Sequence, residues 1–218
     1  MKGLLIKDLK LMKNQMWFFI MIIGISIACA ASFKNPFFAM GYATSLISVF
    51  SVSTISYDEY DNGMPYLFTF PISRKMYVKE KYLYAVLTTI VALAAAVVIS
   101  GGTAIIMDMQ YLMSEWIGII SSSLFLVSLI IAVMLPVRMK FDAEKNKMAM
   151  LVAVGVIILA GVVLLKIADL LNIDLLAFFD GIIYESPVKM LLFVLVVGVV
   201  MIWISYMVSV KIMEKREF

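Results

Sequence analysis

The sequence contains no histidine and only one cysteine, Cys29, among its 218 residues. Without histidine, the commonest general base and metal ligand is missing, and so is the HExxH motif of zinc proteases. A single cysteine cannot form an intramolecular disulfide, and within the apolar run SIACAAS we expect it to pack as a small hydrophobic side chain. These absences argue against metal-dependent proteolysis and against a disulfide-stabilised fold.

Charged residues are also scarce. They make up 15% of the chain, whereas hydrophobic residues make up 64% and the mean hydropathy is +1.04. Average soluble proteins are only about 45–50% apolar. A soluble domain of this length could not bury so much apolar surface, so we expect the bilayer to be the solvent for most of the chain. The net charge of +3 gives no reason to expect a nucleic-acid partner.

Six stretches of the sequence are long and free of charge. A helix needs about 20 residues to cross the hydrocarbon core, and a charged side chain at its centre costs roughly 2.5–3.5 kcal/mol. We therefore predict an all-α polytopic membrane protein, with residues 1–218 forming a single transmembrane domain. The first stretch is predicted to be a retained span rather than a cleaved signal peptide. The six predicted spans are 14–33, 36–56, 82–107, 116–137, 148–165 and 190–210.

The basic residues predict the orientation. Fifteen of the 18 lysines and arginines lie in the N-terminal segment, in loops 57–81 and 138–147, and in the C-terminal tail. Basic residues concentrate on the cytoplasmic side of membrane proteins. We therefore expect both termini and both of these loops to be cytoplasmic, in a multi-pass protein of the cell (inner, cytoplasmic) membrane.

Two further segments are predicted to touch the membrane without crossing it. Residues 1–13 place leucines on one helical face and lysines on the other, with Asp8 on the apolar face, which is typical of a helix lying in the membrane interface. Residues 166–189 are apolar but contain three aspartates, and they predict short helices that re-enter the outer leaflet. A folded cap outside the membrane is the alternative for this outer helical loop.

The spans carry no ionisable residue near their centres, and no GxxxxGK[ST] phosphate loop occurs anywhere. Carriers driven by ion gradients usually need such intramembrane groups, so this class is disfavoured. A chain without a phosphate loop is not expected to hydrolyse ATP itself. We expect no catalytic residue, no metal ligand and no directly bound cofactor.

The loop 57–81 combines acidic residues, Gly63 and Pro65, the aromatic run YLFTF at 66–70, and a basic segment. Clustered aromatic side chains outside the membrane act as anchors for a binding partner. Alternatively, they tuck beneath their own bundle or into the lipid headgroups. The residues alone favour neither interpretation over the other.

The same loop resembles the small ABC-2-type permeases, the membrane subunits of ATP-binding-cassette exporters. The pattern of that family is matched by Glu59, Gly63, Leu67, the PISR motif of Pro71–Arg74, Val78 and Lys81. A second motif of the family resembles LPVRMKFDAEKNKM at 135–148, although Asp142 replaces the usual glycine. Within the family the chain is most similar to exporters of amphipathic peptide toxins, such as phenol-soluble modulins, and to bacteriocin-immunity permeases.

The resemblance implies a homodimer, or a pair with a sister permease, bound to two copies of a separate ATPase that carries ATP and Mg²⁺. It implies an exporter subunit for amphipathic or antimicrobial peptides. A non-transporting interaction or immunity protein and an ion-coupled carrier are the alternatives. The ATPase-coupling contacts would be Glu59, Tyr60, Gly63, Tyr66, Leu67, Phe68, Phe70, Pro71 and Arg74, with Lys140, Phe141, Glu144 and Lys145 in the second cytoplasmic loop.

Overall fold

The computed structural model describes residues 2–60, 63–141 and 186–216, together with isolated residues between 148 and 170. Across these ranges the chain is helical and contains no strand. The helices are α1 (Lys2–Asn14), α2 (Met16–Phe33), α3 (Pro36–Glu59), α4 (Gly63–Leu67), α5 (Arg74–Ile106), α6 (Met113–Lys140) and α9 (Pro187–Lys215).

Five of these helices, α2, α3, α5, α6 and α9, are long and apolar enough to cross a membrane. They confirm the all-α prediction and correspond to five of the six predicted spans. The predicted span 148–165 and the predicted outer helices of 166–189 fall largely outside the described residues. Those two predictions therefore remain predictions.

Local sequence signals explain where the helices begin. Lys34 adopts a left-handed conformation (φ 50°) that ends α2, and the Asn35 side chain then accepts a hydrogen bond (3.0 Å) from a backbone amide in the first turn of α3. Ser73 caps α5 in the same way (3.2 Å). At the start of α6, the Glu115 carboxylate accepts a hydrogen bond (2.9 Å) from the backbone amide three residues earlier.

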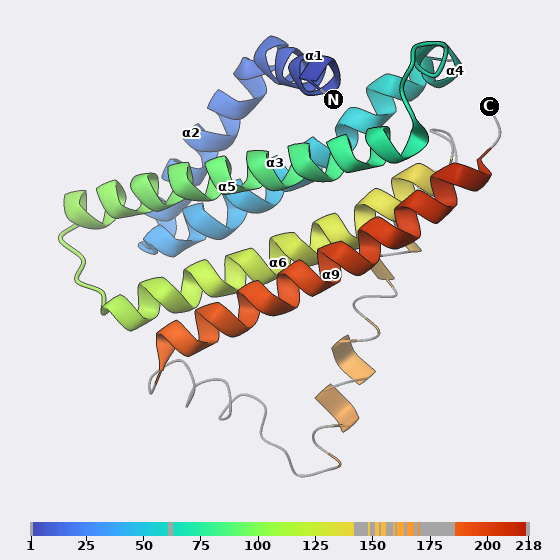
Figure 1. The fold of residues 1–218 in the computed structure, drawn as a ribbon. Coiled ribbons are helices and arrows are strands. Elements are labelled where there is room, and N and C mark those ends of the chain that lie inside the picture. Colours follow the sequence, from blue (N-terminus) through green and yellow to red (C-terminus); the bar gives the residue numbers. More distant parts are fainter. Residues whose placement is uncertain are drawn as a thin grey trace.

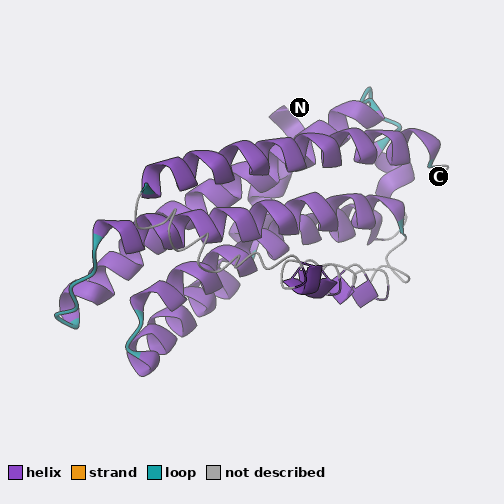
Figure 2. Ribbon diagram, turned by 90° about the horizontal axis from the view of Figure 1, so that it is seen from below, coloured by secondary structure: helices purple, strands orange, loops and turns teal. Residues whose placement is uncertain are grey.

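The long helices form an elongated bundle in which α5, α6 and α9 lie lengthwise (Figure 1). The most extensive contact is between α6 and α9, and α3 packs against both α5 and α6. One end of the bundle contains α4, the start of α5 and the last turns of α6 and α9 (Figure 1). We call it the α4 end. Seen from below, the loops are confined to the ends of the long helices (Figure 2).

Small residues and one large apolar cluster hold the bundle together. The cluster is centred on the half of the bundle nearer the α4 end. Its buried members are Val52, Ile55, Met64, Tyr77, Val78, Tyr82, Ala85, Val127, Ile131, Leu135, Met139 and Met213. Farther along, α6 and α9 approach closely at Gly198, where an added Cβ would lie 3.3 Å from the Ser128 side chain. Such small-residue contacts are typical of helix pairs in membranes.

The predicted N-terminal helix is present as α1, and the side chains that it buries are Leu4 and Asp8. Leu9, which the helical pattern places on the apolar face, is 54% exposed. Asp8 points into the protein because its carboxylate has a cationic partner there. The interior side of α1 is therefore defined partly by charge and not by hydrophobicity alone.

Candidate functional site

Five ionisable side chains meet beneath the surface of the α4 end: Lys7 and Asp8 of α1, Asp58 of α3, and Glu80 and Lys81 of α5. We call this group the ion cluster. Lys81 Nζ lies 2.5 Å from Asp8 Oδ2 and 2.8 Å from Asp58 Oδ2, and it is 1% exposed. Lys7 Nζ contacts Asp58 Oδ1 and lies 3.4 Å from Asp8 Oδ1. The cluster therefore joins three helices that are far apart in the sequence.

Neighbouring hydroxyl groups add hydrogen bonds to three members of the cluster, Lys81, Asp58 and Asp8. Lys81 Nζ also donates to Thr54 Oγ1 (3.3 Å), so all three protons of the ammonium group have acceptors. The Tyr77 hydroxyl donates to Asp58 Oδ2 (3.0 Å), and the Tyr84 hydroxyl donates to the backbone carbonyl of Asp8 (3.4 Å). A buried ion pair with its hydrogen bonds satisfied in this way fixes the relative positions of its helices.

Glu59 and Arg74, two of the predicted coupling residues, contact other helices of the same chain. Arg216 Nη2 donates to Glu59 Oε1 at 2.9 Å, and its other amino group donates to the Met139 carbonyl at 3.0 Å. Arg74 donates to the backbone carbonyl of Glu214 at 2.7 Å. These contacts tie the last turn of α9 to α3, α5 and α6. Glu59 and Arg74 thus take part in contacts between helices at the α4 end.

Gly63 is needed for the tight turn from α3 into α4. A Cβ at this position would lie 2.7 Å from the Asp58 backbone carbonyl oxygen, closer than carbon and oxygen atoms can approach. Only glycine avoids this clash. The start of α4 therefore lies directly beside the backbone of Asp58, a residue of the ion cluster.

The aromatic segment that follows is divided between two environments. Leu67 and Phe68 are half-buried and pack against the apolar core cluster, as does the fully buried Met64. In contrast, Tyr66 is 68% exposed and Phe70 is 50% exposed. Leu67 and Phe68 therefore fit the interpretation in which the segment packs beneath its own bundle. For Tyr66 and Phe70, binding of a partner remains a prediction.

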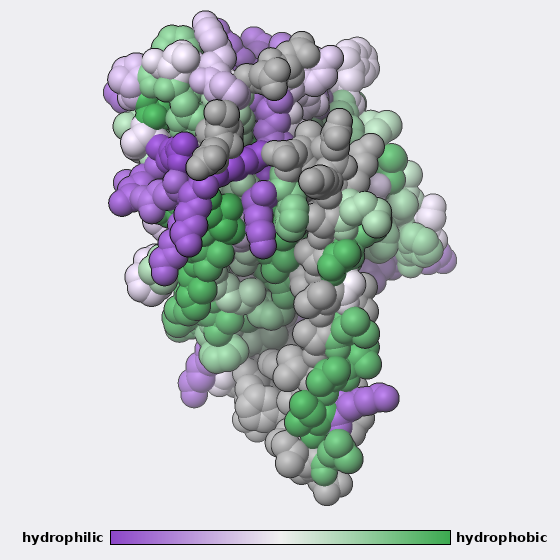
Figure 3. Space-filling model, turned by 90° about the vertical axis from the view of Figure 1, so that its right-hand side faces the viewer, coloured by the Kyte–Doolittle hydropathy of each residue, from purple (hydrophilic) through white to green (hydrophobic). Residues whose placement is uncertain are grey.

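The outward part forms what we call the aromatic surface, which consists of Tyr60, Pro65, Tyr66, Phe70 and Pro71, all exposed. The Tyr66 and Phe70 rings pack edge to face with centroids 5.4 Å apart, so they present a preformed pair. Figure 3 looks onto the α4 end and shows hydrophilic side chains gathered over its upper half, with apolar side chains below.

Of the residues predicted in the second loop, two are described. Lys140 is the last residue of α6, and its Nζ lies 5.4 Å from the centroid of the Phe141 ring that follows. Glu144 and Lys145 lie outside the described residues. At least the start of this loop is therefore at the α4 end, with the last turn of α6.

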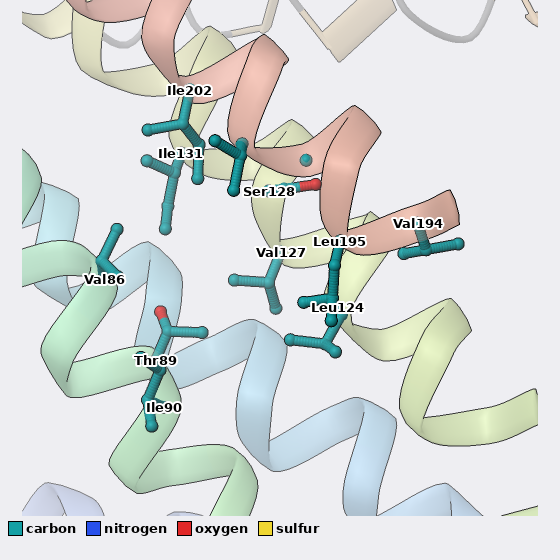
Figure 4. Close-up of a pocket in the computed structure, with 12 residues that line it drawn as sticks. Val86, Thr89, Ile90, Leu124, Val127, Ser128, Ile131, Val194, Leu195 and Ile202 are labelled. Atoms are coloured by element: carbon teal, nitrogen blue, oxygen red, sulfur yellow. The ribbon is translucent and has the colours of Figure 1, made fainter. Parts of the chain in front are cut away.

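A cavity of about 220 Å³ lies between α5, α6 and α9 (Figure 4). Its lining is apolar except for Thr89 and Ser128. Thr89 hydrogen-bonds to Ser48 Oγ (3.1 Å), and Ser128 Oγ donates to the Phe125 carbonyl (2.8 Å). Because both hydroxyls already have partners, the cavity suits hydrocarbon better than water or a hydrated ion, which need several polar contacts.

Sequence reasoning missed the ion cluster. The sequence identifies Lys81 only as a motif residue and as one of the basic residues expected on the cytoplasmic side. It identifies Asp58 only as one of the acidic residues in the loop 57–81. Two signals could have revealed the cluster. Asp8 interrupts the apolar face of its helix, and Tyr77, Glu80 and Tyr84 recur at helical spacing along one face of α5.

Five helices long and apolar enough to cross a membrane define a polytopic α-helical membrane protein. Comparison with known families is more specific: the model of the ABC-2 family of transporter proteins matches residues 3–214, and the chain belongs to that family. No curated protein and no solved structure matches it. ABC-2 permeases are the transmembrane subunits of transporters, are not themselves catalytic, and work with ATPase subunits.

Proposed function

We propose that this chain is the permease subunit of an ATP-driven exporter, and that its aromatic surface docks into a groove of the separate ATPase. The aromatic surface carries this proposal. Tyr66 and Phe70 project outward from a segment whose opposite side, Leu67 and Phe68, is anchored in the core. Exposed aromatic side chains on a rigid support are the usual anchors of a protein interface.

The course of the chain supports a sixth span and a cytoplasmic α4 end. Helices α6 and α9 run in the same direction (Figure 1), so the chain between them must return from the α4 end to the opposite end. The charge-free stretch 148–165 would cover about 27 Å as a helix, close to the roughly 30 Å hydrocarbon thickness. With six spans, the basic residues collect on the α4 side, which is the cytoplasmic side by the positive-inside rule.

The cavity between α5, α6 and α9 supports the further proposal that the cargo is an amphipathic peptide. Its lining offers apolar contacts and no unpaired hydroxyl, so it fits the apolar face of such a peptide. As in the family the chain resembles, we propose that two permeases, either identical or sister subunits, act with two ATPases.

The docking proposal is tested by co-expressing the full chain with ATP-binding-cassette ATPases from the same genome and purifying the complex that forms. We expect Tyr66→Asp and Phe70→Asp to abolish co-purification, because each places a charge in the apolar contact. Leu112→Asp is the matched control, since Leu112 is 65% exposed but lies in the connection between α5 and α6 at the opposite end. If both α4 variants keep the ATPase bound, the aromatic surface is not the docking site.

The cargo proposal has a separate test. Ile90 lines the cavity and is 55% exposed, so Ile90→Trp should fill it without disturbing the core. We expect ATP-dependent uptake of a fluorescent amphipathic helical peptide into inverted vesicles to fall several-fold. The control, Val98→Trp, lies on the same helix and is exposed but does not line the cavity. Equal transport by both variants would contradict a cargo site in this cavity.

A further inference from the structure

The Glu80 carboxyl is the one member of the ion cluster for which the described part of the chain offers no hydrogen bond. The residue is 0% exposed, and neither Oε1 nor Oε2 has a partner. It is surrounded by charge, since Lys7 and Asp8 act on it from α1, Asp58 from α3, and Lys81 from its own helix. A buried carboxylate in this position is unusual and needs an explanation.

The hydrogen-bond donors near Glu80 already donate to other acceptors. The ammonium protons of Lys81 go to Asp8, Asp58 and Thr54. The tyrosines three residues before and four residues after Glu80 each have a single hydroxyl proton, and these go to Asp58 and to the Asp8 carbonyl. Lys7 is bound to Asp58 and pairs with Asp8. None of these donors forms a hydrogen bond with Glu80.

The charges of the cluster do not balance either. Three carboxylates (Asp8, Asp58 and Glu80) face two ammonium groups (Lys7 and Lys81), which leaves one excess negative charge in a buried site. An isolated buried carboxylate is so costly that it takes up a proton instead. The cluster also lacks a hydrogen-bond donor, because Asp8 Oδ1 is a second buried acceptor that receives no hydrogen bond.

From this geometry we infer that Glu80 is a proton-binding site, occupied when α1 is packed against α3 and α5. The bound proton removes the excess charge and supplies the missing donor. Among the described residues no group of three or more acidic, cysteine or histidine side chains could hold a metal ion.

The site links proton binding to the position of α1. Of the two charges that α1 places near Glu80, the carboxylate of Asp8 acts on it more strongly than the ammonium group of Lys7. Ionisation of Glu80 therefore weakens the packing of α1, and protonation removes this repulsion. Conversely, displacing α1 would admit water to Glu80 and release the proton. Proton binding at Glu80 does not depend on whether the chain works with an ATPase.

The direct test is infrared spectroscopy of the full chain in lipid nanodiscs at neutral pH. We expect a carbonyl-stretching band of a protonated carboxylic acid in the wild type, and its loss in Glu80→Gln. Glu214→Gln is the control, because Glu214 is about half exposed, pairs with Lys75 at 3.3 Å, and should leave the band intact. Absence of the band from the wild type, or its persistence in Glu80→Gln, overturns the proposal.

A second measurement addresses α1 itself. Spin labels at Lys10 and Lys79, both exposed, report the separation of α1 and α5 in a Cys29→Ser background. Raising the pH from 7 to 9 should lengthen the distance in the otherwise wild-type chain. It should leave the distance unchanged in Glu80→Gln, which cannot ionise. An identical response of the two chains overturns the link to α1.

A metal cation bound at Glu80, in place of a proton, would be revealed by changing the salt in the buffer. If replacing sodium by choline lowers the thermal unfolding midpoint of the wild type but not of Glu80→Gln, the site holds a metal ion. That result overturns the proton assignment, whereas midpoints insensitive to sodium support it.

Discussion

The α4 end and the middle of the bundle are held together by different interactions. Every ion pair whose two partners are described lies at the α4 end, where Lys81 and Arg216 connect α1, α3, α5, α6 and α9. In the middle, the helices meet through small and apolar residues, and most hydroxyls bond to their own backbone, as Thr44 does to the Met40 carbonyl (2.6 Å). We infer that directional bonds between helices fix the geometry of the α4 end, whereas the apolar contacts of the middle are non-directional and impose no such geometry.

Such a division would suit the proposed exporter, in which a separate ATPase acts on the α4 end. A surface that receives force from another protein must not yield locally, because a soft contact would absorb the movement. Helices that open a path through a membrane, in contrast, must shift against one another at small cost. We therefore expect the removal of a single interaction to lower the free energy of unfolding far more at the α4 end than in the middle of the bundle.

The largest effect is expected for Lys81→Met. The substitution leaves the buried carboxylate of Asp8 without its close cation, and breaking a buried ion pair in this way typically costs about 3–5 kcal/mol. We expect a much lower unfolding midpoint and a lower yield of folded protein. The control is Lys79→Met, two residues away and exposed. Equal midpoints for the two variants would show that the ion cluster adds nothing to stability.

The next effect concerns partner binding rather than folding, and it depends on the proposed function. Tyr66→Ala and Phe70→Ala should each weaken ATPase binding by about 2 kcal/mol or more, as expected for aromatic anchors. Because both side chains are exposed, the unfolding midpoint of the isolated permease should hardly change. Binding isotherms with the purified ATPase measure the first quantity, and thermal unfolding measures the second. A loss of stability without a loss of affinity would assign these residues to the fold instead.

Gly63→Ala tests the turn between α3 and α4. The new methyl group would lie 2.7 Å from the Asp58 carbonyl oxygen, so the backbone must move, at a cost of about 1–3 kcal/mol. The displacement should also weaken the aromatic surface as a docking site. Gly24→Ala is the control, because an added Cβ there meets nothing within 4 Å. A Gly63→Ala variant as stable as Gly24→Ala would show that the turn relaxes freely.

The membrane-crossing helices could be predicted because charge-free length is a direct consequence of the bilayer. The predicted end of the first span and start of the second agree with α2 and α3, which end at Phe33 and begin at Pro36. Other helix ends could not be predicted, since α5 begins at Arg74 although its predicted span begins at residue 82. The absence of charge marks only the part within the hydrocarbon, whereas the helix continues into the polar region, where backbone hydrogen bonds remain favourable.

The candidate site was predictable only in part, for a similar reason. The aromatic run was visible as a local anomaly, but a five-residue helix such as α4 has its inner and outer sides fixed by packing and not by its own sequence. The ion cluster depends on pairs such as Asp8 and Lys81, which lie 73 residues apart. A single sequence shows that such charges exist and does not show which of them meet.

The smallest effect is expected in the middle of the bundle, for Ser48→Ala. Ser48 Oγ donates to the Thr44 carbonyl (2.7 Å), so the Thr89 hydroxyl donates to Ser48 in the contact between α3 and α5. Hydrogen bonds between membrane helices average only about 0.6 kcal/mol, and Thr89 can turn its proton toward its own backbone instead. The unfolding midpoint should therefore fall slightly, far less than in Lys81→Met. A loss as large as that of Lys81→Met would mean that hydrogen bonds also lock the middle of the bundle, and the contrast with the α4 end would disappear.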